Sequence, residues 1–312
     1  MIKCFEAENY YCLKSVALDL QPIHALIGPN DSGKSSLLRA MRAVADVVDP
    51  RNADPPPRGA VLTARASDRW FRLTGTDARP TLEHSGLQGQ APDLLSRGAA
   101  LIKWDAEQLK QPSGLVPESI ALRFGSDHGS GFPGVLQSIQ GRGDESFAQL
   151  RDALVEKFPT LRSLGIAAVN QSMLALRAQL RDGTVVPAAQ ISEGLLYYAA
   201  YLTLQHLRPV SLLLVEEPEN GLHPSRIRDV VCVLRTLAEK GTQVVIATHS
   251  PLVINELRPE EVTLVTRASE ARGTVLTPMT KTKDFERRSK TYALGELWLS
   301  YADGSNESEL VP

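Results

Sequence analysis

The chain has 312 residues, of which 43% are hydrophobic and 22% are charged, and its formal net charge is −2. This composition is ordinary for a soluble globular protein, and the length is sufficient for one large domain or two smaller ones. The near-neutral charge excludes an overall basic field that would indicate nucleic-acid binding, although a local basic face stays open.

Cysteine usage and hydropathy predict the compartment. Cys4, Cys12 and Cys232 share no metal-ligand spacing and are odd in number, so we expect reduced, structural thiols. The opening MIKCFEAENYYCLK carries an acid and polar residues where a secretory signal needs an apolar core. No apolar run approaches the roughly 20 residues that span a bilayer. We therefore predict a cytoplasmic protein without a membrane partner.

The N-terminal part is expected to form strands and then a helix. Residues 2–7, 16–20 and 23–27 have the alternating or continuous apolar character of strands. Apolar residues at helical spacing predict a helix from about 33 to 48. The proline-rich stretch 49–60 ends this helix and is a candidate boundary.

The middle of the chain has a weaker pattern. Residues 60–66, 70–75 and 80–84 predict short antiparallel strands. The glycine-rich residues 125–134 predict a loop, and residues 144–158 predict an amphipathic helix.

The last part alternates clearly between helices and buried strands. A helix is expected from about Ser192, a strand at 211–215, a second helix at about 224–238 and a second strand at 242–248. Strand-helix-strand order with buried strands predicts a parallel α/β sheet. Ligands of such a sheet bind at the carboxyl ends of its strands.

The sequence HALIGPNDSGKSSLL contains a phosphate-binding loop. Gly28, Gly33, Lys34 and Ser35 fit the pattern G-x-x-x-x-G-K-[ST] between a predicted strand and a predicted helix. Backbone N–H groups of such a loop and the helix N-terminus bind phosphate oxygens. Lys34 would reach the β- and γ-phosphates, and the Ser35 hydroxyl would bind Mg²⁺. The residues predicted to bind ATP here are Gly28, Pro29, Asn30, Asp31, Ser32, Gly33, Lys34, Ser35 and Ser36.

In the sequence LLLVEEPENGLHPS, acidic residues follow an apolar run that predicts a buried strand. Carboxylates at such a strand end are unfavourable unless a cation binds them, and the phosphate loop indicates that this cation is Mg²⁺. Glu216 is predicted to bind Mg²⁺ together with Ser35. Glu217 would face the γ-phosphate and act as the general base toward the attacking water.

Two further motifs accompany the loop and the acids. VVIATHSP ends a buried strand in Thr248, His249 and Ser250, from which His249 could reach the γ-phosphate. AAQISEG places Ser192 and Gly194 at a helix start, where Ser192 is open to interpretation as an ordinary N-cap.

Together these motifs resemble the ABC-type ATPases, specifically the branch with RecF, SMC proteins and OLD-like ATPases. GPNDSGKSS looks like Walker A, ISEG like the signature, LLLVEEPENGLHP like Walker B with its D-loop, and THS like the switch-histidine loop. The four occur in the family's order. The resemblance covers about residues 1–48 and 185–300, and it includes the opening FEAENYYCLKSVALDL and the final YALGELWLS.

The resemblance implies a fold, a division of the chain and an assembly. The fold would be an α/β P-loop NTPase, an ABC-ATPase head with a mostly parallel sheet and an N-terminal antiparallel β part. Residues 1–48 and 185–312 would form the ATPase core, and 49–184 an inserted β and helical lobe. The protein would form a homodimer around ATP, in which Ser192 and Gly194 contact the nucleotide of the partner and His249 senses the γ-phosphate.

The sequence departs from the family pattern at several positions. Asp31 stands where many relatives have glycine, Glu216 replaces an aspartate, and His223 takes the place of the D-loop aspartate. For the Q-loop, Gln137 and Gln140 are only candidates. OLD-like nucleases continue into a Toprim domain, for which the polar tail of this chain leaves no room, so we expect any nuclease activity to belong to a separate protein.

These features predict an Mg²⁺-dependent ATPase that acts as a switch in DNA repair or anti-phage defence with a separately encoded effector. Two alternatives stay open: the nucleotide-binding subunit of a membrane transporter, and a nucleotide-gated scaffold with negligible turnover. DNA as a partner is also left open, because the basic segment 281–290 is diluted by Asp284 and Glu286.

Overall fold

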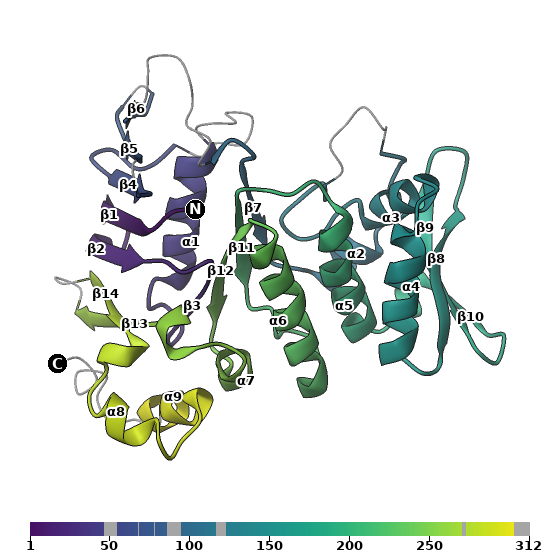
Figure 1. The fold of residues 1–312 in the computed structure, drawn as a ribbon. Coiled ribbons are helices and arrows are strands. Elements are labelled where there is room, and N and C mark those ends of the chain that lie inside the picture. The colour runs from purple at the N-terminus through teal and green to yellow at the C-terminus, as the bar shows by residue number, and fades with distance from the viewer. Residues whose placement is uncertain are drawn as a thin grey trace. The chain divides into compact units, whose positions relative to one another are not determined.

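The fold is described from a computed structural model that covers residues 1–46, 55–67, 69–77, 79–85, 95–116, 123–269 and 273–302. Contacts between residues divide the chain into two compact units. The first unit contains Met1–Leu101, Val210–Pro218 and Leu234–Pro312, and the second contains Ile102–Pro209 and Glu219–Val233. Figure 1 labels the helices and strands.

Two sheets form most of the first unit. The elements of this unit are β1 (Cys4–Tyr10), β2 (Leu13–Asp19), β3 (Ile23–Ile27), α1 (Lys34–Asp46), β4 (Val61–Arg65), β5 (Trp70–Thr74), β6 (Thr81–His84), β7 (Ala99–Ile102, whose last residue belongs to the second unit), β11 (Leu212–Glu216), β12 (Gln243–Thr248), α7 (Pro251–Asn255), β13 (Val262–Ser269), β14 (Gly273–Pro278), α8 (Phe285–Arg288) and α9 (Leu294–Ala302).

The larger sheet has the strand order β14-β13-β3-β12-β11-β7. Strands β13, β3, β12 and β11 are mutually parallel, and β14 is antiparallel to β13. Every residue of β3, β11 and β12 is buried, which explains their continuous apolar sequences, since strands of a parallel sheet are covered on both faces. The predicted mostly parallel sheet is confirmed.

The smaller sheet is antiparallel, with the order β2-β1-β4-β5-β6. It confirms the predicted antiparallel N-terminal part, and it joins the three strands predicted at 60–84 to β1 and β2. The predicted end of the first strand, at residue 7, is wrong. Strand β1 continues to Tyr10 because its pairing with β2 extends to the partners Tyr10 and Leu13.

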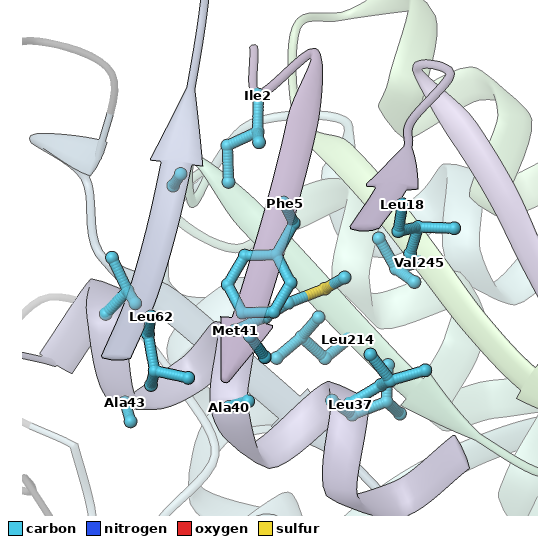
Figure 2. Packing of buried hydrophobic residues seen from close by; sticks show 14 of the residues in the cluster. Ile2, Phe5, Leu18, Leu37, Ala40, Met41, Ala43, Leu62, Leu214 and Val245 are labelled. Carbon is cyan, nitrogen blue, oxygen red and sulfur yellow. The ribbon is translucent and has the colours of Figure 1, made fainter. Parts of the chain in front are cut away.

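The main core of this unit lies around α1. Figure 2 shows Phe5 of β1, Leu62 of β4, Met41 of α1, Leu214 of β11 and Val245 of β12 within one cluster of buried side chains. The apolar residues of α1 recur at helical spacing, so that one face of the helix is buried against the strands. This packing fixes the helix that begins directly after the phosphate loop.

The second unit combines a three-stranded antiparallel sheet with helices. The sheet has the order β10-β9-β8. The elements are α2 (Ala106–Lys110), α3 (Phe132–Gly141), α4 (Ser146–Lys157), β8 (Leu161–Ala168), β9 (Leu174–Leu180), β10 (Val185–Pro187) and α5 (Glu193–Thr203). Helix α6 (Pro224–Glu239) contributes residues to both units.

One expectation for the second unit is confirmed and one is wrong. The helix predicted at 144–158 is α4, which buries Leu150 and Leu154. The loop predicted at 125–134 ends early, because α3 already begins at Phe132. Pro133 lies in the first turn of α3, where its missing N–H is not needed for a helical hydrogen bond.

A buried histidine lies in β3, the strand that leads into the phosphate loop. The Nε2 atom of His24 lies 3.0 Å from the Thr263 hydroxyl, and its Nδ1 atom is buried without a hydrogen-bond partner. Burial lowers the pKa of His24 to about 4, although the nearby Glu261 and Asp19 carboxylates oppose this shift. The folded protein therefore favours the neutral ring.

We predict that this histidine makes the free energy of unfolding depend on pH. The pKa of His24 is 6.5 in the unfolded chain and about 4 in the folded protein, so the unfolded chain binds the proton first as the pH falls. Above pH 6.5, His24 contributes roughly 3 kcal/mol to the free energy of unfolding. This contribution is lost as the pH falls toward 4. Urea unfolding of the wild type and His24→Gln between pH 4 and 8 measures the difference. Parallel pH dependences of the two proteins would show that His24 does not contribute.

Candidate nucleotide-binding site

Three neighbouring parallel strands bring the predicted catalytic segments to one edge of the larger sheet. In the register of β11, β12 and β3, Glu216 lies opposite Ala247, and Ala247 lies opposite Leu26. The next residues along these strands lead into Glu217, Thr248 and the loop that starts at Gly28. The carboxyl ends of parallel strands are where such sheets bind ligands.

Lys34 is hydrogen-bonded to the backbone of the phosphate loop. The Nζ atom of Lys34 donates hydrogen bonds of 2.7 Å to the carbonyl oxygens of both Gly28 and Pro29. Lys34 is also the first residue of α1. Its ammonium group therefore lies over the loop at a helix N-terminus, where a helix and its lysine together favour a bound anion.

Both glycines of the loop are required by their surroundings. A side chain at Gly28 would place its Cβ atom 2.0 Å from the carbonyl oxygen of Val265. At Gly33 the Cβ atom would lie 2.3 Å from the Thr274 hydroxyl, and its φ of +109° also disfavours other residues. Asp31 has a φ of +62°, a left-handed conformation that Asp tolerates better than most residues. The departure from glycine at Asp31 thus keeps the backbone form of the loop.

The residues present fit a phosphate group with Mg²⁺. The hydroxyl oxygen of Ser32 is buried and has no hydrogen-bond partner in the structure. A bound phosphate oxygen could supply that partner. Asn30, Asp31 and Ser35 are exposed, and Pro29, Lys34 and Ser36 are half-buried. Within the described residues, no three His, Cys, Asp or Glu side chains are grouped so that they could hold a metal ion. Mg²⁺ beside phosphates commonly takes only one or two protein ligands and completes its shell with water and phosphate oxygens.

Glu217 and His249 face one another from the ends of β11 and β12. The distance between Glu217 Oε1 and His249 Nδ1 is 3.9 Å, and both side chains are partly exposed. Glu216, one residue earlier, is buried. The backbone N–H of Glu217 donates to the Ala247 carbonyl at 2.8 Å while its φ is +49°. A left-handed backbone is strained at a glutamate, and strained residues of this kind cluster at functional sites.

Ser192 and Gly194 lie in the second unit, at the start of α5. Ser192 occupies the N-cap position with extended backbone, yet its side chain makes no capping hydrogen bond. It is also exposed, and Gly194 is half-buried. The alternative interpretation of Ser192 as a side-chain cap therefore lacks its defining hydrogen bond.

Other segments contact the phosphate loop without a sequence signal. The Thr274 hydroxyl, from β14, donates to the carbonyl of Ser32 at 2.9 Å. The Cys12 thiol, from the turn between β1 and β2, donates to the Ser36 hydroxyl at 3.4 Å. Neither residue belongs to the four nucleotide-binding motifs, and the strand pairing brings them to the loop.

The remaining candidate residues lie as follows. Gln137 and Gln140, the candidates for the Q-loop, both lie in α3 of the second unit. The basic segment 281–290 includes α8, and there Arg287 pairs with Asp284 at 3.2 Å. The acids of this segment therefore neutralise part of its charge.

A phosphate loop before a helix, with acids and a histidine on the adjacent strand ends, defines the class of P-loop ATPases. Residues 83–255 match the family described as "AAA domain, putative AbiEii toxin, Type IV TA system", and residues 1–121 match the family "AAA ATPase domain". The first match covers more than half of the chain, and the chain belongs to this AAA-domain family.

A relative named OLD nuclease, from Thermus scotoductus, is 23% identical over 340 aligned positions. The alignment covers 88% of this chain and 64% of the relative. The chain thus spans less than two thirds of the length of that protein.

Solved structures of SMC heads are similar in fold. The SMC head bound to the C-terminal winged-helix domain of ScpA has a TM-score of 0.59 at 14% identity, with 89% of this chain and 97% of that chain covered. The head from Pyrococcus furiosus has a TM-score of 0.59 at 12% identity, covering 93% and 98%. The head from Thermotoga maritima has 0.51 at 15%, covering 89% and 98%.

The family matches confirm an AAA-family ATPase domain, and the similarity to the SMC heads confirms the predicted fold class. The resemblance to OLD-like and SMC proteins agrees with the relative and the solved structures to which the chain is similar. In the part of the chain that the structure describes, no helix combines the length and apolar character needed to cross a membrane. The roles of the individual site residues stay predictions.

Proposed function

We propose that this protein is an Mg²⁺-dependent ATP-hydrolysing switch whose two copies close around ATP. Lys34 and the loop 28–36 bind the phosphates, while Ser35 and Glu216 hold Mg²⁺. That ion would supply charge neutralisation on the phosphate oxygens. Glu217 orients the attacking water and takes its proton, and His249 senses the γ-phosphate.

One observation supports this proposal most directly: Glu217 Oε1 lies 3.9 Å from His249 Nδ1, and His249 follows β12, the strand between β11 and the strand β3 that leads into the phosphate loop. A general base needs to lie within reach of the proton it takes, and a second polar group fixes its orientation. The buried Glu216 beside this pair supplies the separate carboxylate that a metal ion requires.

We base the proposed dimer on the exposed start of α5. Ser192 is a hydroxyl at a helix N-terminus without a capping bond, so it can bind a phosphate oxygen presented by a second copy. We propose that ATP binding closes the dimer and that hydrolysis opens it, in the cytoplasm. By family analogy alone, the setting is DNA repair or anti-phage defence with a separately encoded effector.

Lys34→Ala tests the site. The substitution removes the fixed positive charge over the loop, so we expect ATP binding to weaken at least tenfold, or turnover to vanish, while the fold survives. Lys240→Ala, which removes an exposed lysine after α6, is the control and should behave as wild type. ATP binding by calorimetry and phosphate release measure the two properties. If folded Lys34→Ala protein released phosphate at the wild-type rate, the loop around Lys34 would not be the ATP-hydrolysis site.

The two alternative functions have separate tests. A scaffold with negligible turnover would bind ATP without releasing phosphate, with or without DNA. A transporter subunit would be recovered in washed membranes together with a partner that has membrane-spanning helices.

A further inference from the structure

A loop of the second unit is packed against the start of α5. This loop, Glu219–Leu222, follows the acidic end of β11 and is closed by a hydrogen bond of 3.1 Å from the Leu222 N–H to the Glu219 carbonyl. Gly221 has a φ of +67°. A Cβ atom at Gly221 would lie 2.2 and 2.5 Å from two carbons of the Tyr197 ring. Only a glycine fits against this ring without a shift.

The contact extends to the first turn of α5. A Cβ atom at Gly194 would approach the Gly221 carbonyl oxygen to 3.2 Å. The Glu193 carboxylate lies 3.5 Å from the position where a Gly221 side chain would begin. The two residues that follow Ser192, Glu193 and Gly194, therefore lie close to the same loop as Tyr197.

The Tyr197 ring is held from its other end. Its hydroxyl accepts a hydrogen bond of 3.1 Å from the backbone N–H of Ala106, and the side chain is buried. Tyr201, one turn further along α5, is fully buried. Burial raises the pKa of Tyr201 well above its usual range, and the Glu219 carboxylate raises it further, which agrees with a position of Glu219 beside this helix.

We infer that Tyr197 and Gly221 are positioning residues, through which α5 sets the loop that follows the catalytic strand. Glu219 is two residues from Glu217 in the chain, so the position of the loop limits where the Glu217 carboxylate lies. This inference rests on the proposed function, because it assigns the two residues to the hydrolysis step. A contact between Ser192 and a second copy would act on the same helix and so on the same loop.

Tyr197→Ala and Tyr198→Ala form a matched pair for the test. Both remove a buried tyrosine ring from α5, but the Tyr198 ring packs near Phe158, with ring centroids 5.9 Å apart, whereas the Tyr197 ring carbons are the atoms nearest to a Cβ atom at Gly221. We expect Tyr197→Ala to keep the ATP Kd within twofold of wild type and to lower kcat about tenfold or more, since small displacements of a catalytic group have effects of this size. Tyr198→Ala should keep the kcat of its folded fraction. Gly221→Ala disturbs the contact from the other side and should act like Tyr197→Ala.

Hydrogen exchange of the Leu222 N–H gives a second measurement that does not depend on turnover. Tyr197→Ala and Gly221→Ala should speed this exchange at least tenfold relative to Tyr198→Ala, because the loop loses its support. Equal kcat values and equal exchange in the Tyr197 and Tyr198 variants would overturn the inference. A wild-type protein without ATP turnover would instead contradict the proposed function, and the exchange rates would still decide whether α5 positions the loop.

Discussion

Glu217→Gln is expected to bind ATP and to retain it, with turnover reduced by roughly a hundredfold or more. Glutamine keeps the shape and the hydrogen bonding of the side chain but cannot accept the proton of the attacking water. Glutamine would adopt the same left-handed backbone, with φ of +49°, as the glutamate that it replaces, so the fold should survive. Phosphate release under single-turnover conditions measures the chemical step, and retention of labelled ATP on a desalting column measures the bound state.

Glu216→Gln is the matched control for Glu217→Gln, since it makes the same change one residue earlier. Glu216 is buried and Glu217 is partly exposed, which fits a ligand of Mg²⁺ and a base toward water, respectively. We expect Glu216→Gln to raise the Mg²⁺ concentration needed for half-maximal activity. If Glu216→Gln retained ATP and Glu217→Gln changed the Mg²⁺ requirement, the two roles would be exchanged.

Ser192→Arg should abolish ATP-driven dimerisation and ATP hydrolysis while each monomer still binds ATP. Ser192 is exposed and makes no capping hydrogen bond, so a long side chain there can be tolerated by the monomer. In the closed dimer, however, the arginine would occupy the space in which Ser192 contacts the γ-phosphate of the ATP bound to the second copy. The expected loss is more than tenfold in hydrolysis, with less than a twofold change in monomer ATP affinity.

Light scattering with and without ATP and Mg²⁺ measures the mass of wild type and Ser192→Arg. Ser192→Ala serves as the control for the missing hydroxyl, and its thermal unfolding should stay close to wild type because no capping bond is lost. A Ser192→Arg protein that dimerises and hydrolyses ATP normally would return this segment to the role of a plain helix start.

The phosphate-loop strand and the ends of β11 and β12 could be predicted because local signals agree there. Continuous apolar runs, a glycine pattern and acids follow one another in sequence, and the fold places them as parallel neighbours. The left-handed position of Asp31 was likewise open to prediction, because it depends on local backbone chemistry.

Long-range packing around the site could not be predicted. The need for glycine at Gly28 arises from the carbonyl of Val265, more than 200 residues away in the chain. Thr274 reaches the loop only through the pairing of β13 with β14 and with β3. The Tyr197 ring against Gly221 likewise depends on how α5 packs, which no spacing in the sequence encodes.

Helix starts within irregular sequence were also difficult to predict. Phe132 begins α3 within a glycine-rich segment that predicts a loop. There Gly131, with φ of +85°, turns the chain into the helix, so the glycines that suggest a loop in fact provide the helix entry.

Mixing Ser192→Arg with Lys34→Ala protein tests the ATP-bridged dimer most directly. In one mixed dimer, one site combines an intact phosphate loop with an intact Ser192, and the other site carries both substitutions. We predict that ATP hydrolysis returns in the mixture to a substantial fraction of the wild-type rate, although each variant alone is inactive. A mixture as inactive as its components, with mixed dimers shown by light scattering to form, would contradict action of Ser192 on the ATP of the second copy.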